Sequence, residues 1–213
     1  MKKTFSIISF ILAISGCSSP LKQTEHDALV IKSGDISALE KLYRKSLSSD
    51  NGYSSAEINE ISLSLANSYL KNGDLDNSSF VLNTIDEKSL AKDVLTAKVY
   101  LAMNDPVKLD KFIKKIECDE FDDVCSELYR VKMFSAIKNK NINQAFMYSE
   151  KQRLYGGVTA VSRNDLAALH ILSSNYDRAK PILISILQQD PKNKTAKSNL
   201  RVLEYMKNAS NNK

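Results

Sequence analysis

The sequence has little glycine, proline or histidine, and it has no tryptophan. Its 213 residues include 6 glycines, 4 prolines and 2 histidines. An all-β protein needs many tight turns, and tight turns draw on glycine and proline, so their scarcity favours long helices joined by short polar connections. Apolar residues make up 43% of the chain and charged residues 26%, which is ordinary for a globular domain with one core.

Recognised catalytic motifs are also missing. The chain holds no GxSxG, no HExxH and no phosphate-binding glycine loop. His170 falls at a packing position of an expected helix, which favours an interior histidine over a general base. The acidic stretch 119–123 lacks the spacing and the glycine of an EF-hand, so we expect a solvated loop there. We therefore expect no catalysis, no cofactor and no bound metal.

Charge of one sign is not concentrated in any stretch. The net charge is +5 at pH 7, and two of the positive charges, Lys2 and Lys3, belong to a segment that we expect to be removed. No stretch interleaves basic and aromatic residues in the way that a nucleic-acid groove does. We expect no nucleic-acid partner.

The N-terminal stretch MKKTFSIISFILAISGC has the layout of a secretory signal. Two lysines precede an apolar run at residues 5–14, and small residues follow it. The run is too short to span a bilayer as a stable helix. We expect residues 1–16 to be a signal peptide.

The end of this segment, Ile14-Ser15-Gly16-Cys17, resembles the lipobox of bacterial lipoproteins. The resemblance implies that Cys17 becomes the mature N-terminus and carries lipid on its sulfur and its amine. Several acyl chains anchor a protein stably where one chain does not. Serine at position 18 implies the outer membrane in lipoproteins of this kind, with the protein on the periplasmic face. Residues 17–25 are then expected to be a lipidated polar tether.

Two cysteines remain once Cys17 is set aside. Cys118 and Cys125 flank an acidic stretch, and an even pair in an oxidising compartment is a disulfide candidate. A bond would pin two neighbouring helices together, but the spacing is not a known disulfide signature, so two unpaired thiols stay equally open. A metal site is disfavoured, because no histidine is near in the sequence and CxxC spacing is absent.

Short polar turns recur along the chain at intervals of 31 to 39 residues. The aspartate or asparagine of each turn is Asp35, Asp74, Asp105, Asn141 or Asn175. Apolar residues on both sides recur at spacings of three and four, which predicts amphipathic helices. The turn side chain can cap the second helix of each pair. The stretch SSAE at 54–57 fits a capping box and predicts that a helix begins at residue 55.

Helical hairpins that repeat with a period near 34 residues resemble the tetratricopeptide repeat. The residues that match its signature or packing positions are Leu65, Ala66, Tyr69, Gly73, Ser78, Ala145, Leu166, Ala167, Tyr176, Ala179 and Pro191. The resemblance implies an all-α fold, an α-solenoid of about five tetratricopeptide-like hairpins over residues 26–208. A capping helix at 195–207 would close it and a flexible tail at 209–213 would follow. Leu39 and Leu109 replace the small closing residue, so we expect those two hairpins to be splayed. Pro181 is expected to kink the second helix of the last hairpin or to delay the start of that helix.

Repeats of this family bind proteins on a concave face that the first helix of each unit lines. The register places on that face Glu60, Leu63, Asn67, Lys71, Lys98, Arg130, Phe134, Lys138, Asn164, Ala168 and Ile171. Asn67 is the most suggestive of these, because the family often uses an asparagine there to grip a peptide backbone. Each of them has the alternative of being a packing or merely exposed residue.

A signal peptide, a lipobox and a helical-repeat body together resemble the lipoproteins of bacterial envelope assembly machines. Residues 163–206 are similar to the lipoprotein of the tight-adherence (Flp) pilus system, with Asn164 to Ala168 and Asn199-Leu200 carrying the match. That resemblance implies a scaffold that helps a pilus secretin or other assembly components to assemble or localise at the outer membrane.

Two alternatives stay open. One is another scaffold, either a pilotin of a different pilus or secretion system or an accessory of outer-membrane barrel assembly. The other is an enzyme or a ligand-binding lipoprotein, which would need a deep polar pocket and ionisable groups with shifted pKa values. The sequence contains no cluster of residues that would build such a pocket.

Overall fold

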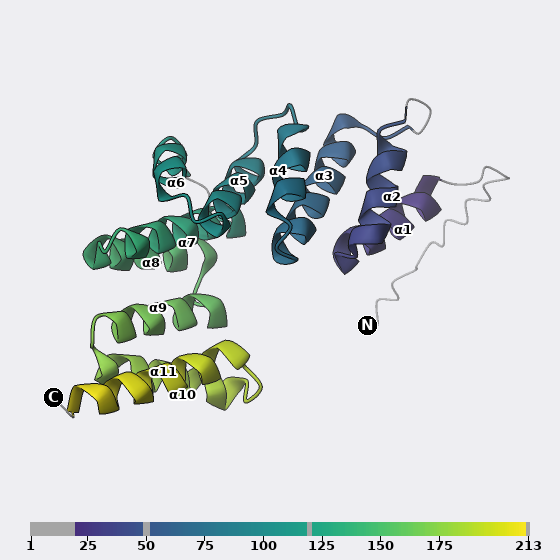
Figure 1. Ribbon diagram of the computed structural model, residues 1–213. Helices are drawn as coiled ribbons and strands as arrows, with labels where there is room; N and C mark the ends of the chain where they lie inside the picture. Colours follow the sequence, from purple (N-terminus) through teal and green to yellow (C-terminus); the bar gives the residue numbers. More distant parts are fainter. Residues whose placement is uncertain (1–19, 49–51, 119–120, 212–213) are drawn as a thin grey trace, which may run out of the picture.

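The computed structural model describes residues 20–48, 52–118 and 121–211, and in this part of the chain every regular element is an α-helix. The helices form five hairpins, α1/α2 to α9/α10, and α11 follows the last hairpin (Figure 1). Their bounds are α1 (Pro20–Ser33), α2 (Ile36–Ser46), α3 (Ser55–Lys71), α4 (Leu75–Asn83), α5 (Leu90–Ala102), α6 (Pro106–Ile113), α7 (Asp123–Lys138), α8 (Ile142–Gly156), α9 (Ala160–Leu172), α10 (Tyr176–Gln189) and α11 (Lys194–Asn211). Consecutive helices pack on one another, so the expected all-α helical-repeat solenoid is confirmed.

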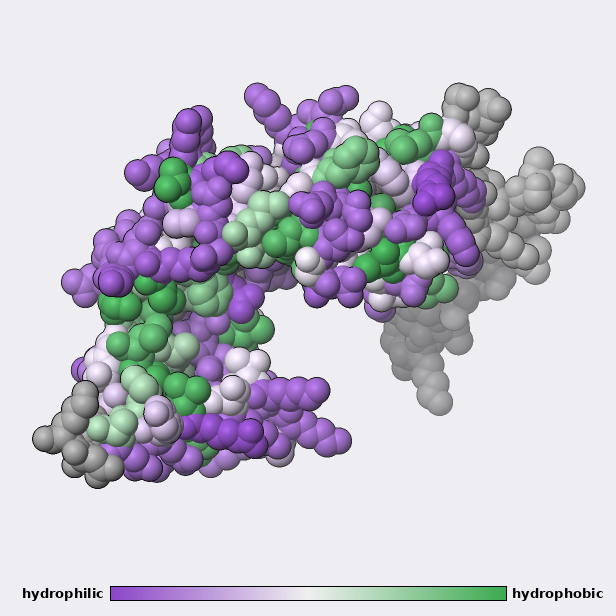
Figure 2. Space-filling model, viewed as in Figure 1, coloured by the Kyte–Doolittle hydropathy of each residue, from purple (hydrophilic) through white to green (hydrophobic). Residues whose placement is uncertain are grey.

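The solenoid follows a bent path (Figure 1). Helices α1 to α6 form an N-terminal arm, α7 and α8 lie at the bend, and α9 to α11 form a C-terminal arm beneath them. The space-filling view shows that the two arms enclose a wide hollow (Figure 2). No helix in the described ranges combines the length and the apolar character that crossing a membrane requires.

The five hairpin turns share one backbone geometry, and they lie where the sequence predicted them. The residue before each turn aspartate or asparagine has a positive φ, at Gly34 (66°), Gly73 (83°), Asn104 (57°), Lys140 (58°) and Ser174 (58°). That left-handed residue ends the first helix. In four of the turns the next side chain accepts a hydrogen bond from the N–H three residues on, and so caps the second helix. Asn175 occupies the fifth position and makes no such bond.

The fourth residue after each turn aspartate or asparagine is completely buried. These residues are Leu39, Ser78, Leu109, Ala145 and Ala179, each 0% exposed. The first helix offers a matching residue eight positions before the turn, so that Leu109 shares a cluster with Ala97, and Ala145 shares one with Met133. In these two units a large side chain on one helix meets a small one on the other, which accommodates Leu109 in a register position where other units carry alanine or serine.

The ends of the helical region extend beyond the expected bounds. Helix α1 begins at Pro20, inside the expected tether 17–25, because proline is well tolerated in the first turn of a helix. Helix α11 continues to Asn211, so the expected tail at 209–213 is helical over its first three residues. The signal peptide and Cys17 lie outside the described residues.

Two local predictions can be compared with the helix bounds. Helix α3 begins at residue 55 behind the predicted capping box, in which Ser54 and Glu57 bond each other's backbone. The Ser54 N–H donates to the Glu57 carboxylate and lowers its pKa. Pro181 lies inside α10 and does not delay its start, because α10 begins at Tyr176, five residues earlier.

Candidate functional site

A groove of about 420 Å³ opens between α3, α5 and α7, the first helices of three successive units. Its apolar lining residues are Leu63, Ala91, Val94, Leu95 and Val124, and its polar lining residues are Ser64, Asn67, Lys98, Asp123 and Glu127. The volume falls within the range of roughly 300–1,000 Å³ that is usual for ligand pockets. We call this feature the α3–α7 groove. It brings together Leu63, Asn67 and Lys98, which the repeat register placed on one face.

Asn67 has a polar group in the groove that is available to a ligand as both donor and acceptor. Its side chain is half-buried, and its amide makes no hydrogen bond to any residue that the structure describes. An asparagine amide offers two donors and one acceptor oxygen. Ser64, one turn away, instead donates to the carbonyl of Ile31 at 3.3 Å. Asn67 is therefore the side chain that is set to bond an incoming backbone.

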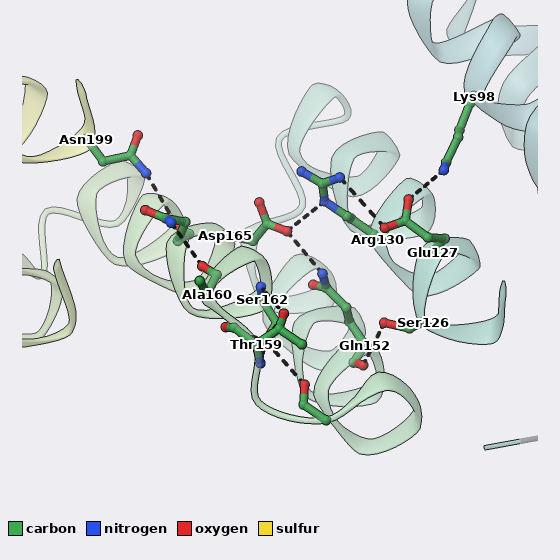
Figure 3. A network of polar contacts seen from close by, with 12 residues as sticks. Lys98, Ser126, Glu127, Arg130, Gln152, Thr159, Ala160, Ser162, Asp165 and Asn199 are labelled. Carbon is green, nitrogen blue, oxygen red and sulfur yellow. Dashed lines mark hydrogen bonds and ion pairs between the residues drawn. The ribbon is translucent and has the colours of Figure 1, made fainter. Parts of the chain in front are cut away.

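Two charged residues at the edge of the groove, Lys98 and Glu127, pair with each other. Lys98 Nζ lies 2.6 Å from Glu127, and Arg130 lies 3.8 Å from the other oxygen of that carboxylate. Arg130 Nε also donates to Asp165 on α9 at 2.8 Å, and Gln152 of α8 donates to the same oxygen at 3.0 Å (Figure 3). The result is a chain of polar contacts that runs from α5 across α7 to α8 and α9. We call it the polar ladder.

The sequence predictions named Lys98 and Arg130 but missed their acidic partners. Glu127 lies fourteen residues before Asn141, the turn residue of its unit. The same offset placed Glu60 on the concave face, so the repeat register could have predicted Glu127 as well. Asp165 and Gln152 carried no such signal, because their roles depend on how α9 sits against α7 and α8.

Several predicted face residues lie outside the groove. Glu60 lines a smaller crevice of about 150 Å³ between α1 and α3, and Lys71 is exposed. Arg130 is engaged in the polar ladder and lies over the Phe134 ring at 5.4 Å. Lys138 donates to Asn104 at 2.8 Å and to a neighbouring carbonyl. Arg130 and Lys138 therefore hold the solenoid together in this conformation.

The expectation that Asn164 and Ile171 lie on an open face is corrected by their burial. Each is only 4% exposed. Asn164 donates to the carbonyl of Ala160 at 2.9 Å, and the Asn199 amide of α11 reaches the Asn164 carbonyl at 3.4 Å. Ile171 belongs to the core cluster that α9, α10 and α11 share. Helix α11 covers this side of α9, and Ala168 is half-buried beside these residues.

The burial of the predicted packing residues depends on whether they lie within a helix or in a turn. Those within helices are buried or half-buried, namely Leu65, Ala66, Tyr69, Ser78, Ala145, Leu166, Ala167, Tyr176 and Ala179. Ser78 donates to the carbonyl of Ala66 at 2.8 Å and joins the two helices of its hairpin. Burial and a 2.6 Å hydrogen bond to Glu40 raise the pKa of Tyr69 to about 12. Gly73 and Pro191 are exposed, in the turn after α3 and in the turn after α10.

Cys118 and Cys125 are joined by a disulfide, with their Cα atoms 5.7 Å apart. Both are buried, and they share a core cluster with Val94 and Leu128. The bond therefore ties the segment after α6 to the first turn of α7. Asp122 lies close to both sulfurs, but sulfurs that are bonded to each other are not available as thiolate ligands for a metal.

A second hollow of about 450 Å³ lies between α6, α7 and α8. Its polar groups largely bond one another, since Asp110 accepts hydrogen bonds from Ser135 and from Asn139. Lys132 donates to the carbonyl of Ile116 at 2.8 Å. Burial lowers the pKa of Lys132, and nearby Lys151 lowers it further.

His170 is half-buried and its ring lies 5.2 Å from that of Phe146. Burial lowers its pKa, and the positive charges of Arg178 and Arg153 add to the effect. Its Nδ1 atom is buried and has no hydrogen-bond partner among the described residues. The histidine is thus only partly interior, and its Nδ1 atom is not satisfied, unlike the satisfied interior histidine that the sequence favoured.

The chain matches no protein-family model, no curated protein and no solved structure in the comparisons with known proteins. The α3–α7 groove therefore has to be interpreted from its own geometry.

Proposed function

We propose that this protein is a non-catalytic scaffold of a bacterial envelope, and that its α3–α7 groove binds an extended segment of a partner protein. The available amide of Asn67 above an apolar floor is the observation that carries this proposal. An extended segment has a backbone donor and acceptor at almost every residue, which an asparagine amide can bond. Its apolar side chains would bury against Leu63, Val94 and Leu95.

The partner that we propose is a secretin or another component of a tight-adherence (Flp) pilus secretion machine. The support is the resemblance of the C-terminal stretch around Asn164–Ala168 and Asn199-Leu200 to the lipoprotein of that system. The proposed role is to assist assembly or localisation of the machine. A pilotin of another secretion system or an accessory of barrel assembly would use the same groove for a different partner.

The anchor that we propose is lipid on Cys17, with the helical body on the periplasmic face of the outer membrane. We predict that Cys17→Ser leaves the protein unprocessed or soluble, because no acyl chains can then be attached. Fractionation of cells into inner-membrane, outer-membrane and soluble material checks this prediction. Recovery of the variant in the outer membrane at the parental level would contradict it.

Site-specific photocrosslinking in intact cells tests the groove. A photoreactive residue at Asn67 is compared with the same residue at Asn83, an exposed asparagine at the end of α4. We expect a crosslinked partner from position 67 and none from position 83. The same partner from both positions, or from neither, would count against the groove as the binding surface.

Mass spectrometry of the crosslinked product then tests the pathway. A secretin or a pilus assembly component supports the tight-adherence role. A barrel-assembly protein or a component of another secretion system would keep the scaffold and overturn that pathway. A groove that captures only small molecules would instead favour a ligand-binding lipoprotein.

A further inference from the structure

The two arms of the solenoid meet at a junction that differs from the other steps between units. In the N-terminal arm each first helix packs against the next, α1 on α3, α3 on α5 and α5 on α7. Helices α7 and α9 make no such backbone contact, so the backbone of α9 packs on the preceding hairpin through α8. Helix α8 ends at Gly156, and the connection to α9 begins with Gly157, which has a φ of 75°, a conformation that glycine adopts without strain.

The apolar part of the junction is small. Leu169 of α9 is completely buried in a cluster with Met133 and Ala136 of α7 and Ala145 of α8. Next to it, the His170 ring lies against Phe146, half-buried. The buried side chain of Leu169 therefore fixes the position of α9 on the α7/α8 hairpin.

The polar part of the junction is poorly matched. Five buried side-chain atoms have no hydrogen-bond partner among the described residues, and all of them belong to α8 or α9: Ser149 Oγ, Gln152 Oε1, Arg153 Nε, Asn164 Oδ1 and His170 Nδ1. A buried polar atom without a partner has lost its bonds to water and gained none in return. Gln152 and His170 make contacts between α8 and α9, so opening the junction would give water access to their unpaired atoms and would offset part of the lost apolar contact.

The carboxylate of Asp165 ties the C-terminal arm to the α7/α8 hairpin at the bend in the observed conformation. It accepts a hydrogen bond from Arg130 of α7 and another from Gln152 of α8, and its residue is only 8% exposed (Figure 3). Truncating it would remove both bonds and leave Arg130 with Glu127 as its ionic partner, on its own helix.

We propose that the α8/α9 junction is a hinge, with Leu169 as its pivot and Asp165 as a latch that keeps the arms closed around the hollow seen in Figure 2. The inference concerns the mechanics of the solenoid and does not depend on the identity of a partner. The latch belongs to the polar ladder, which continues to Glu127 and Lys98 at the edge of the α3–α7 groove. A carboxylate of a bound segment that pairs with Arg130 would therefore compete with Asp165 for it and shift the hinge toward the open state.

Pulsed electron paramagnetic resonance can measure the distance between the arms directly. Nitroxide labels are placed at Asn83→Cys on α4 and Gln188→Cys on α10, two exposed positions, in the full 213-residue chain in detergent. Cys17→Ser removes the remaining thiol, and the disulfide stays oxidised. In the Asp165→Ala variant we expect a broader distribution of inter-label distances with a new population at longer distance.

Asp177→Ala is the matched control. It removes a carboxylate that pairs with Lys207 at 3.1 Å between α10 and α11, an ion pair that lies within the C-terminal arm and does not cross the junction. We expect the parental distance distribution from it. A parental distribution in Asp165→Ala, or the same broadening in both variants, would overturn the hinge.

A milder variant tests the same contact in case Asp165→Ala does not fold. Asp165→Asn keeps the side-chain volume and an acceptor for Gln152 while it removes the charge that Arg130 bonds. Circular dichroism at 222 nm establishes that each variant retains its helices. If Asp165→Ala fails to fold, broadening in the folded Asp165→Asn protein supports the latch, and a parental distribution in it refutes the latch.

Discussion

Replacing Ala179 with leucine tests the hairpin register on which both proposals depend. Ala179 is completely buried, and it shares a core cluster with Ala167 across the last hairpin and with Leu183 on its own helix. Leucine adds three carbons, which would stabilise the fold by about 2.4 kcal/mol if a space existed for them. None exists between two alanines at a helix crossing, so overpacking is expected to destabilise the protein by about 1–3 kcal/mol.

The assay is thermal unfolding followed by circular dichroism, with urea unfolding as a second measure. In a protein of this size each kcal/mol moves Tm by about 2–4 °C, so Ala179→Leu is expected to lower Tm by roughly 2–12 °C. Ala102→Leu is the control, because Ala102 is exposed at the end of α5 and its replacement should change the free energy of unfolding by less than about 0.5 kcal/mol.

The opposite substitution at the same register position should also destabilise. Leu109 is completely buried against Ala97, so Leu109→Ala leaves a cavity and is expected to cost about 2–5 kcal/mol. A Tm for Ala179→Leu at or above the parental value would refute the argument that this position is a close helix crossing.

Two further predictions concern Lys140, a turn residue with a positive φ, and the half-buried His170. Lys140 is exposed with a φ of 58°, so Lys140→Gly should raise the free energy of unfolding by about 1 kcal/mol in a urea titration, whereas a lower midpoint would contradict a strained turn. The pKa of His170 is lowered in the fold, so the unfolded chain takes up the proton first as the pH falls through about 6.5. Acidification from pH 7.5 to 5.5 should therefore lower Tm more in the parent than in His170→Phe, and equal losses would show that His170 is not responsible.

Local patterns in the sequence determined the number of hairpins and where each one turns. An aspartate or asparagine after a residue that can adopt a positive φ closes a helix and caps the next one through bonds that span only a few residues. Such turns can therefore be predicted without knowledge of the rest of the fold. The same register brought Leu63, Asn67 and Lys98 to one groove, because residues at equal offsets from successive turns lie on equivalent faces of successive first helices.

Tertiary structure alone decided the bend between α8 and α9. Helix α11 buries Asn164 and Ile171, which the register placed on an open face, and the bend lets Arg130 reach Asp165 of the next unit. These outcomes depend on how side chains far apart in the sequence pack against one another, and no periodic pattern encodes that angle. The unsatisfied polar atoms of α8 and α9 also depend on tertiary packing, since nothing in the sequence of either helix marks these residues as unpaired.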